Sequence, residues 1–222
     1  MSEIVESCEH LRILQRDGAL QGKTYRGFVI SEVDLSRAYL AGAVFEKVEF
    51  KGVELGAADL SRAVFRQSDL RGVMLREALL HRTSLSDCLL TEADLGGAHL
   101  EDAEVARVEF QKASFVGAKL VSTSFHDVNL LRARFDGAVL IKCRFDFPAQ
   151  GTASLGRASF AGATLVECDL GGAHLMDADF SGALLLKCDL RKAELARARS
   201  TWTRLVACET TGADLPEGFP IG

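Results

Sequence analysis

The sequence repeats with a period of five residues over most of its length. Every fifth residue from Ile30 to Leu215 gives 38 positions, of which 23 are leucine and 10 are phenylalanine. The residue two places before each, from Val33 to Ala213, is Ala, Val, Ser, Thr or Cys everywhere except at Pro148. Each pentad therefore carries one large and one small apolar residue, and a repeat this long constrains the fold more strongly than local propensity does.

Neither regular secondary structure accommodates this period. On an α-helix five residues advance about 500°, so successive leucines would cover every side and leave no amphipathic face. On a straight strand successive leucines would alternate between faces, but residues two apart share one face. The period therefore predicts short extended pieces separated by turns, wound into a coil with the large and small apolar residues inside. Coils about 4.8 Å apart would pair their backbone groups as strands do.

The motifs resemble those of a known family. Ala58-Asp59-Leu60, Ala93-Asp94-Leu95, Ala178-Asp179-Phe180 and Ala213-Asp214-Leu215 are similar to the A(D/N)LXX pattern of pentapeptide-repeat proteins. The resemblance covers residues 28–217. It implies an all-β, right-handed quadrilateral β-helix (a pentapeptide-repeat solenoid) with four pentads, or twenty residues, in each coil.

Both ends of such a solenoid need covering, because an open terminal coil exposes apolar surface and an unpaired edge. We expect an N-terminal helical cap and lead-in over residues 1–27, with a short helix at 3–16 between Ser2 as N-cap and Gly18 as terminator. Residues 218–222 form the C-terminal cap or tail. There Phe219 and Ile221 either fold back over the last coil or meet a second molecule, which would be a homodimer through the C-terminal end.

Two places depart from the repeat. Pro148 and Gln150 occupy inward positions beside an extra aromatic, Phe147, which predicts a loop or bulge at 146–152. That loop is either a contact site or a tolerated distortion, since loops on rigid scaffolds often carry function. Trp202 falls at an outward position, where it either packs on the terminal cap or forms part of a contact surface.

The cysteines and histidines do not form a recognisable chemical site. Cys88, Cys143, Cys168, Cys188 and Cys208 all occupy the small inward position, where free cysteine behaves as a small hydrophobe. One thiol per coil does not supply the converging ligands of a zinc site. The histidines inside the repeats are outward and isolated, and no phosphate loop, nucleophile elbow or HExxH motif is present. We therefore predict no enzymatic activity, no metal and no cofactor.

Composition bounds the partners and the compartment. The formal net charge is −5 and the pI is about 5.6, so the basic stripe of a nucleic-acid-binding surface is missing. No run of about 18 apolar residues suggests a membrane span, and the N-terminus lacks the pattern of a signal peptide. A cytoplasmic protein that binds another protein, without direct contact to nucleic acid or membrane, is the resulting prediction.

The outward carboxylates are the candidate binding residues. With twenty residues in every coil, the residue before each large one falls into two acidic columns: Glu49, Asp69, Glu109, Asp169, Asp189 and Glu209 in one, and Asp34, Glu54, Asp94, Glu194 and Asp214 in the other. One interpretation is that they imitate DNA phosphates. The resemblance then implies a quinolone-resistance-like protein that protects a type II topoisomerase, DNA gyrase or topoisomerase IV, from poisons. The alternative is that aspartate only serves the turn, and that the rod is a generic scaffold for an unknown partner.

Overall fold

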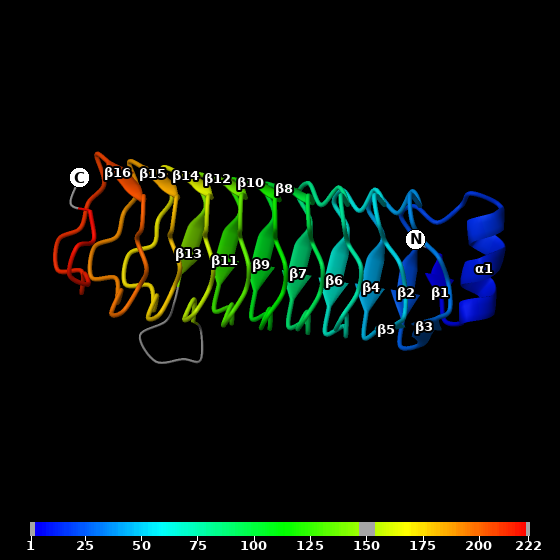
Figure 1. Cartoon of the computed structure of the whole chain (residues 1–222). Helices are drawn as coiled ribbons and strands as arrows, with labels where there is room; N and C mark the ends of the chain where they lie inside the picture. Colours follow the sequence, from blue (N-terminus) through cyan, green and yellow to red (C-terminus); the bar gives the residue numbers. More distant parts are fainter. Residues whose placement is uncertain (1–2, 147–153, 221–222) are drawn as a thin grey trace.

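The chain winds into a straight rod of about ten turns, with a single helix at its N-terminal end (Figure 1). This computed structural model describes residues 3–146 and 154–220. Its elements are β1 (Ile4–Val5), α1 (Cys8–Arg16), β2 (Thr24–Arg26), β3 (Val29–Ser31), β4 (Val44–Glu46), β5 (Glu49–Lys51), β6 (Val64–Arg66), β7 (Ser84–Ser86), β8 (His99–Glu101), β9 (Glu104–Ala106), β10 (Lys119–Val121), β11 (Ser124–His126), β12 (Val139–Ile141), β13 (Arg144–Asp146), β14 (Thr164–Val166), β15 (Leu184–Leu186) and β16 (Arg204–Val206). No helix in the described ranges is long and apolar enough to cross a membrane.

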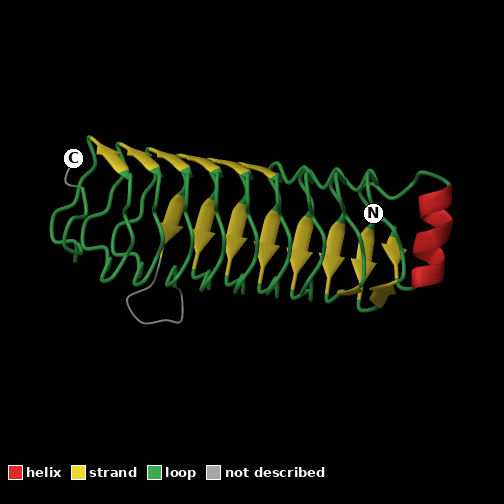
Figure 2. Cartoon of the chain, in the orientation of Figure 1, coloured by secondary structure: helices red, strands yellow, loops and turns green. Residues whose placement is uncertain are grey.

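Parallel pairing between successive coils defines the four sides of the rod. The eight-stranded face has the order β1-β2-β4-β6-β7-β9-β11-β13, and the six-stranded face has the order β16-β15-β14-β12-β10-β8 (Figure 2). A third side, the β3–β5 face, continues from β3 and β5 through single bridges such as Glu49 to Asp69. The fourth face consists of bridges alone, beginning with Asp34 to Glu54. The predicted four-sided β-helix is confirmed.

A left-handed residue closes each pentad. The residue two places after the large apolar one has φ near +60° throughout the rod, and 25 non-glycine residues of the described chain adopt this conformation. In many pentads the next amide donates back to the carbonyl of the large residue, as Ala58 does to Leu55 at 3.1 Å. Left-handed backbone costs an ordinary residue about 1–2 kcal/mol, so the rod tolerates this cost because interior packing and coil pairing fix the turn.

Large side chains stack along the rod axis. Rings of Phe115, Phe135, Phe160 and Phe180 follow one another with centroids 4.7, 5.0 and 5.0 Å apart and interplanar angles of 4–5°. Tyr25, Phe45 and Phe65 form a second ladder, with 4.8 Å between neighbours. The spacing of these rings matches the spacing of the coils, so each aromatic ring covers the one in the next turn.

The N-terminal cap differs from the predicted helix. The helix starts at Cys8 rather than residue 3, and its N-cap is Ser7, whose hydroxyl accepts the amide of His10 at 3.2 Å. Ile4–Val5 instead pairs with Thr24–Tyr25, so the first coil begins before the helix and Val5 and Tyr25 belong to the core. The helix ends at Arg16, as predicted, with Gly18 (φ +67°) just beyond the cap residue Asp17, and it buries Leu11 and Leu14 over the first coil. A two-residue strand that pairs with a distant segment leaves no local signal, which explains the error.

One coil is longer than the others, and it changes the predicted columns. Asn129 pairs with Ser154, Val139 with Thr164, and Arg144 with Asp169, which are offsets of 25 residues instead of twenty. Five extra residues therefore fall between Asp146 and Ser154, and every later pentad lies one face before the face that a coil of twenty residues would give it. The predicted loop itself, with Phe147, Pro148 and Gln150, lies outside the described residues.

The C-terminal end is covered in part by the chain itself. Phe219 is buried and contacts Phe180 edge-on, with ring centroids 6.2 Å apart, so it folds back over the last coil. Trp202 takes no part in this cap, because 86% of its surface is exposed. The prediction that Trp202 packs on the terminal cap is therefore wrong, and its role in a contact surface stays a prediction.

We expect Leu95→Lys to lower the free energy of unfolding by more than about 4 kcal/mol, because the ammonium would be buried in a packed column without a partner. Leu89→Lys is the matched control, since Leu89 points outward and is 39% exposed. Urea unfolding followed by circular dichroism measures both variants. Equal stability of the two would contradict the inward assignment of Leu95.

Candidate protein-interaction surface

The predicted carboxylates lie in three columns rather than two. Glu49, Asp69 and Glu109 begin a column on the β3–β5 face that continues, after Asn129, through Ser154 and His174 to Glu194 and Asp214. Asp34, Glu54 and Asp94 lie on the fourth face, where Asp179 and Arg199 follow instead of Glu194 and Asp214. Asp169, Asp189 and Glu209 continue the eight-stranded face after Arg144. The two-column arrangement was wrong because it assumed twenty residues in every coil.

Many of the aspartates hold the turns of their own pentads. In each case the carboxylate Oδ1 accepts the backbone amide two residues later, at 2.8–3.1 Å. The residues are Asp34, Asp69, Asp94, Asp169 and Asp189. Asp214 is an exception, because proline at 216 has no amide hydrogen. Aspartate before the large apolar residue thus has a structural role whatever else it does.

Cations neutralise a large share of the acidic columns. Arg71 contacts Asp69 and Arg191 contacts Asp189, each at 2.5 Å within one pentad. Other pairs join neighbouring coils, including Arg76 with Asp94 at 2.6 Å and His174 with Glu194 at 2.7 Å. These cations were not among the predicted site residues, although opposite charges two, eighteen or twenty residues apart were visible in the sequence.

Hydrogen bonds to these carboxylates shift their titration. The side chain and amide of Arg71 hold the pKa of Asp69 below its usual range, and Arg191 does the same for the pKa of Asp189. The pKa of Asp34 is lowered by hydrogen bonds from the side chain and amide of Ser36. These groups therefore stay ionised at neutral pH, and their charge contributes to the surface.

The unbalanced negative charge gathers at one end of two adjoining faces. Between residues 29 and 117, the β3–β5 face and the fourth face carry nine outward carboxylates and only five cations, Arg37, Lys51, Arg71, Arg76 and Lys112. We call the nine the acidic surface: Glu32, Asp34, Glu49, Glu54, Asp69, Glu77, Glu92, Asp94 and Glu109. Beyond residue 128 the same two faces are close to neutral, with six carboxylates and five cations among their described residues. The N-terminal half of these faces is thus the candidate interaction surface.

The cysteines form a buried column beneath the eight-stranded face. Cys143, Cys168, Cys188 and Cys208 succeed one another, and each Sγ donates to a carbonyl of the preceding coil at 3.4–3.5 Å. Burial raises the pKa of Cys88 to about 11, and contact with Cys143 together with burial raises the pKa of Cys168 to about 12. The same contact with Cys168 lowers the pKa of Cys143, whereas the thiols of Cys88 and Cys168 stay protonated at neutral pH and are therefore poor nucleophiles and poor ligands.

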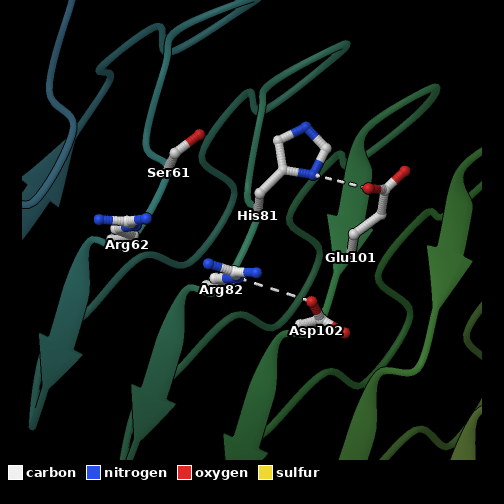
Figure 3. Close-up of a pocket in the computed structure, with 6 residues that line it drawn as sticks. All are labelled: Ser61, Arg62, His81, Arg82, Glu101 and Asp102. Atoms are coloured by element: carbon white, nitrogen blue, oxygen red, sulfur yellow. Dashed lines mark ion pairs between the residues drawn. The ribbon is translucent and has the colours of Figure 1, made fainter.

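His81 lines a recess in which charged side chains of adjacent coils pair with one another. A recess of about 250 Å³ on the six-stranded face is lined by Ser61, Arg62, His81, Arg82, Glu101 and Asp102 (Figure 3). His81 faces Glu101 and Arg82 faces Asp102, both at 3.6 Å, so opposite charges from adjacent coils pair across it. Over residues 3–146 and 154–220, no three His, Cys, Asp or Glu side chains are grouped so that they could hold a metal ion.

The fold and the surface define a class: a β-helical rod whose ordered outward side chains offer binding faces. The pentapeptide-repeat family matches residues 30–67, 49–87, 88–127, 153–191 and 173–208, and the chain belongs to this family. No curated protein matches the sequence.

Solved structures with the same fold include two forms of QnrB1, a plasmid-mediated fluoroquinolone resistance protein. One trypsin-treated form is 22% identical, with a TM-score of 0.57, over 82% of this chain and 91% of that one. A second is 19% identical, with a TM-score of 0.51, over 92% of each chain. HetL, a heterocyst differentiation regulator from Nostoc sp. strain PCC 7120, is 24% identical over 96% of this chain and 98% of its own, with a TM-score of 0.40.

The depressed pKa values of Asp69 and Asp189 predict acid sensitivity. Because their folded-state pKa values lie below the unfolded ones, their stabilising effect is complete above about pH 5 and is lost as the pH falls below about 4. The double variant Asp69→Asn, Asp189→Asn keeps an oxygen for the turn but cannot ionise. We expect its melting temperature to depend less on pH between 6 and 3 than that of the wild type, and identical pH profiles would contradict this role.

The buried thiols predict selective labelling. In the native protein a thiol reagent at pH 8 should modify at most Cys8 and Cys208, which are partly accessible, whereas all six cysteines should react after denaturation. Counting modified thiols by mass spectrometry measures this. Rapid labelling of Cys168 in the folded protein would show that this column is exposed or activated.

Proposed function

We propose that this protein is a non-enzymatic scaffold that binds a protein partner, and that its acidic surface docks in a basic, DNA-binding groove. The observation that carries the proposal is the excess of outward carboxylates on the N-terminal half of two adjoining faces. A rigid rod holds these charges in place before binding, so little side-chain and backbone ordering opposes association. The partner we infer is a type II topoisomerase, gyrase or topoisomerase IV, which the rod would protect from fluoroquinolone poisons.

Two considerations support this partner and one limits its strength. The rod shares its fold with QnrB1, whose description as a fluoroquinolone resistance protein fits the same target. The acidic surface also spans five coils, or about 24 Å at 4.8 Å per coil. B-DNA of that length carries about 14 negative charges, whereas the nine carboxylates of the acidic surface and the five cations on the same two faces sum to −4. The electrostatic imitation is therefore weak, and we expect modest affinity that falls steeply with salt.

A supercoiling assay tests the proposal. We expect the protein at micromolar concentration to reduce the fluoroquinolone inhibition of gyrase, or to compete with DNA for the enzyme. The triple variant Glu49→Lys, Glu54→Lys, Glu109→Lys should lose this effect, because the change reverses the charge of the acidic surface. These three glutamates accept no backbone amide in their turns, so the rod should keep its stability.

The matched control makes the same change in net charge on a different face of the rod. Glu104→Lys, Asp127→Lys, Asp146→Lys changes the net charge by the same amount on or beside the eight-stranded face, and it should protect gyrase as well as the wild type does. No effect of the wild-type protein on gyrase or topoisomerase IV would exclude this partner. Equal loss in both triple variants would show that total charge, rather than the acidic surface, is responsible.

A further inference from the structure

The C-terminal half of the six-stranded face is apolar on its outside. Seven outward side chains of β10 to β16 are aliphatic and at least partly exposed, and they include Val139 and Val206, which are 38% and 40% exposed. They are Val121, Val139, Ile141, Val166, Leu184, Leu186 and Val206. The same strand positions of the eight-stranded face hold polar residues in β11 and β13: Ser124, His126, Arg144 and Asp146. A sheet normally keeps its solvent side polar, so this apolar face is an unusual exposed patch.

A run of glycines borders the apolar face. Gly97, Gly117, Gly137, Gly162 and Gly182 occupy the left-handed position at the corner with the fourth face, in five successive coils. Arginine, lysine and aspartate adopt the same conformation at other corners, for example Arg132 and Lys187. A Cβ added to Gly117, Gly137 or Gly162 would meet nothing within 4 Å. Packing inside the rod therefore does not demand these glycines, and their effect is to leave the edge of the apolar face flat.

Trp202 ends this glycine corner. It occupies the left-handed position in the next coil, with φ +62°, and projects its indole into solvent. An exposed tryptophan beside a flat apolar strip offers a large contact area at a small cost in conformational entropy, as at many protein interfaces. The patch thus combines a flat apolar strip with a projecting tryptophan, and the tryptophan of one molecule can pack against the strip of another.

Charge is distributed unevenly along the same face. Glu101 and Asp102 lie at its N-terminal end, where Lys119 contacts Glu101 at 3.4 Å and Arg82 contacts Asp102 at 3.6 Å, whereas Lys187 and Arg204 lie at its C-terminal end. Lys187 and Arg204 make no ion pair with any residue of the described ranges. Lys142 and Glu167 occupy equivalent positions in the two middle coils, 3.8 Å apart.

We propose that this face binds the same face of a second copy of the chain, with the two rods antiparallel. A two-fold axis that runs parallel to the strands, between β12 and β14, makes the face self-complementary. Across this axis Ile141 of each copy lies opposite Val166 of the other copy. Lys142 of each copy likewise lies opposite Glu167 of the other copy, so each contact occurs twice. The indole of Trp202 then lies over the glycine corner of the other rod, at its Gly97 end.

Charge complementarity selects this arrangement. Antiparallel rods set Lys142 against Glu167 of the second copy, and they bring Arg204 to the coil of the second copy that carries Glu101. Parallel rods would leave Lys142 opposite the glycine corner and would gather the two basic ends, with Lys187 and Arg204, together, which is unfavourable.

The area of the contact face limits the affinity of the dimer. The whole contact face from β8 to β16 covers six coils, and at about 4.8 Å per coil and a width near 14 Å it gives roughly 400 Å² per copy, about half of a standard interface. The dimer is therefore reversible, with a dissociation constant in the micromolar range. The acidic surface lies on other faces and takes no part in it, so this inference stands independently of the topoisomerase partner.

Self-association provides the first test. Sedimentation velocity from 1 to 300 µM should show a monomer–dimer equilibrium, and the emission of Trp202, the only tryptophan, should shift to the blue as the dimer forms. Val139→Lys should raise the dissociation constant at least tenfold. Ser124→Lys, at the equivalent strand position of the eight-stranded face, should leave it unchanged. A wild type that is monomeric at every concentration, or a dimer that Val139→Lys does not weaken, would overturn the proposal; an end-to-end dimer would give the latter result.

Charge exchange tests the antiparallel arrangement. Lys142→Glu alone and Glu167→Lys alone each place like charges opposite one another across the axis, so each variant should be largely monomeric. An equimolar mixture should form a heterodimer, because both contacts are then between opposite charges. Circular dichroism melting should show all three samples folded, since an exposed ion pair contributes only about 0–1 kcal/mol. A mixture that associates no better than either variant alone would refute this geometry.

Discussion

Backbone hydrogen bonding between parallel coils is the constraint on which the rest of the structure depends. Because each coil pairs with the next at a fixed separation, a side chain in one coil lies directly over its counterpart in the neighbouring coil. Inside the rod this requires equal layers, which the leucine columns and the ladder from Phe115 to Phe180 supply. On the outside, equivalent residues of successive coils form columns. His174 therefore contacts Glu194, and Arg197 contacts Asp177, although each pair is twenty residues apart in the sequence.

The geometry of the turns is constant, but the residue types at the corners can vary. Every pentad uses the same left-handed position, yet the rod accepts Arg, Lys, Asp, Glu and Gly there. Aspartate before the large residue secures many of the turns, as Asp94 does through the amide of Gly96. The chain can therefore vary each corner with little effect on the core. A corner that repeats one residue type, such as the glycine corner, then needs a reason outside the core.

Periodicity was enough to predict the four-sided β-helix and the inward columns, because the small and large positions alternate in sequence as they do in space. It was not enough to place Asp169, Asp189, Glu194, Glu209 and Asp214. An insertion of five residues keeps the period of five intact, so the irregular pentad with Pro148 and Gln150 predicts an interruption but does not reveal that the later pentads have moved to another face. The helix start at Cys8 was missed for a different reason: Ile4–Val5 joins a sheet through Thr24–Tyr25, a contact that local spacing does not report. The cations that neutralise the acidic columns were visible in the sequence, but their contacts depend on the columns being correct.

Because a rod has independent faces, its two proposed surfaces do not compete. The acidic surface occupies the β3–β5 and fourth faces in the N-terminal half, and the apolar patch occupies the six-stranded face in the C-terminal half. An antiparallel dimer through the patch would leave both acidic surfaces exposed and place them at opposite ends of a longer assembly. Two weak electrostatic sites held in one rigid body bind a two-fold symmetric target far more tightly than either does alone, provided that their separation fits the target. If the proposed partner is two-fold symmetric, dimerisation is a physical route by which a surface with less than a third of the charge density of DNA would compete with DNA for it.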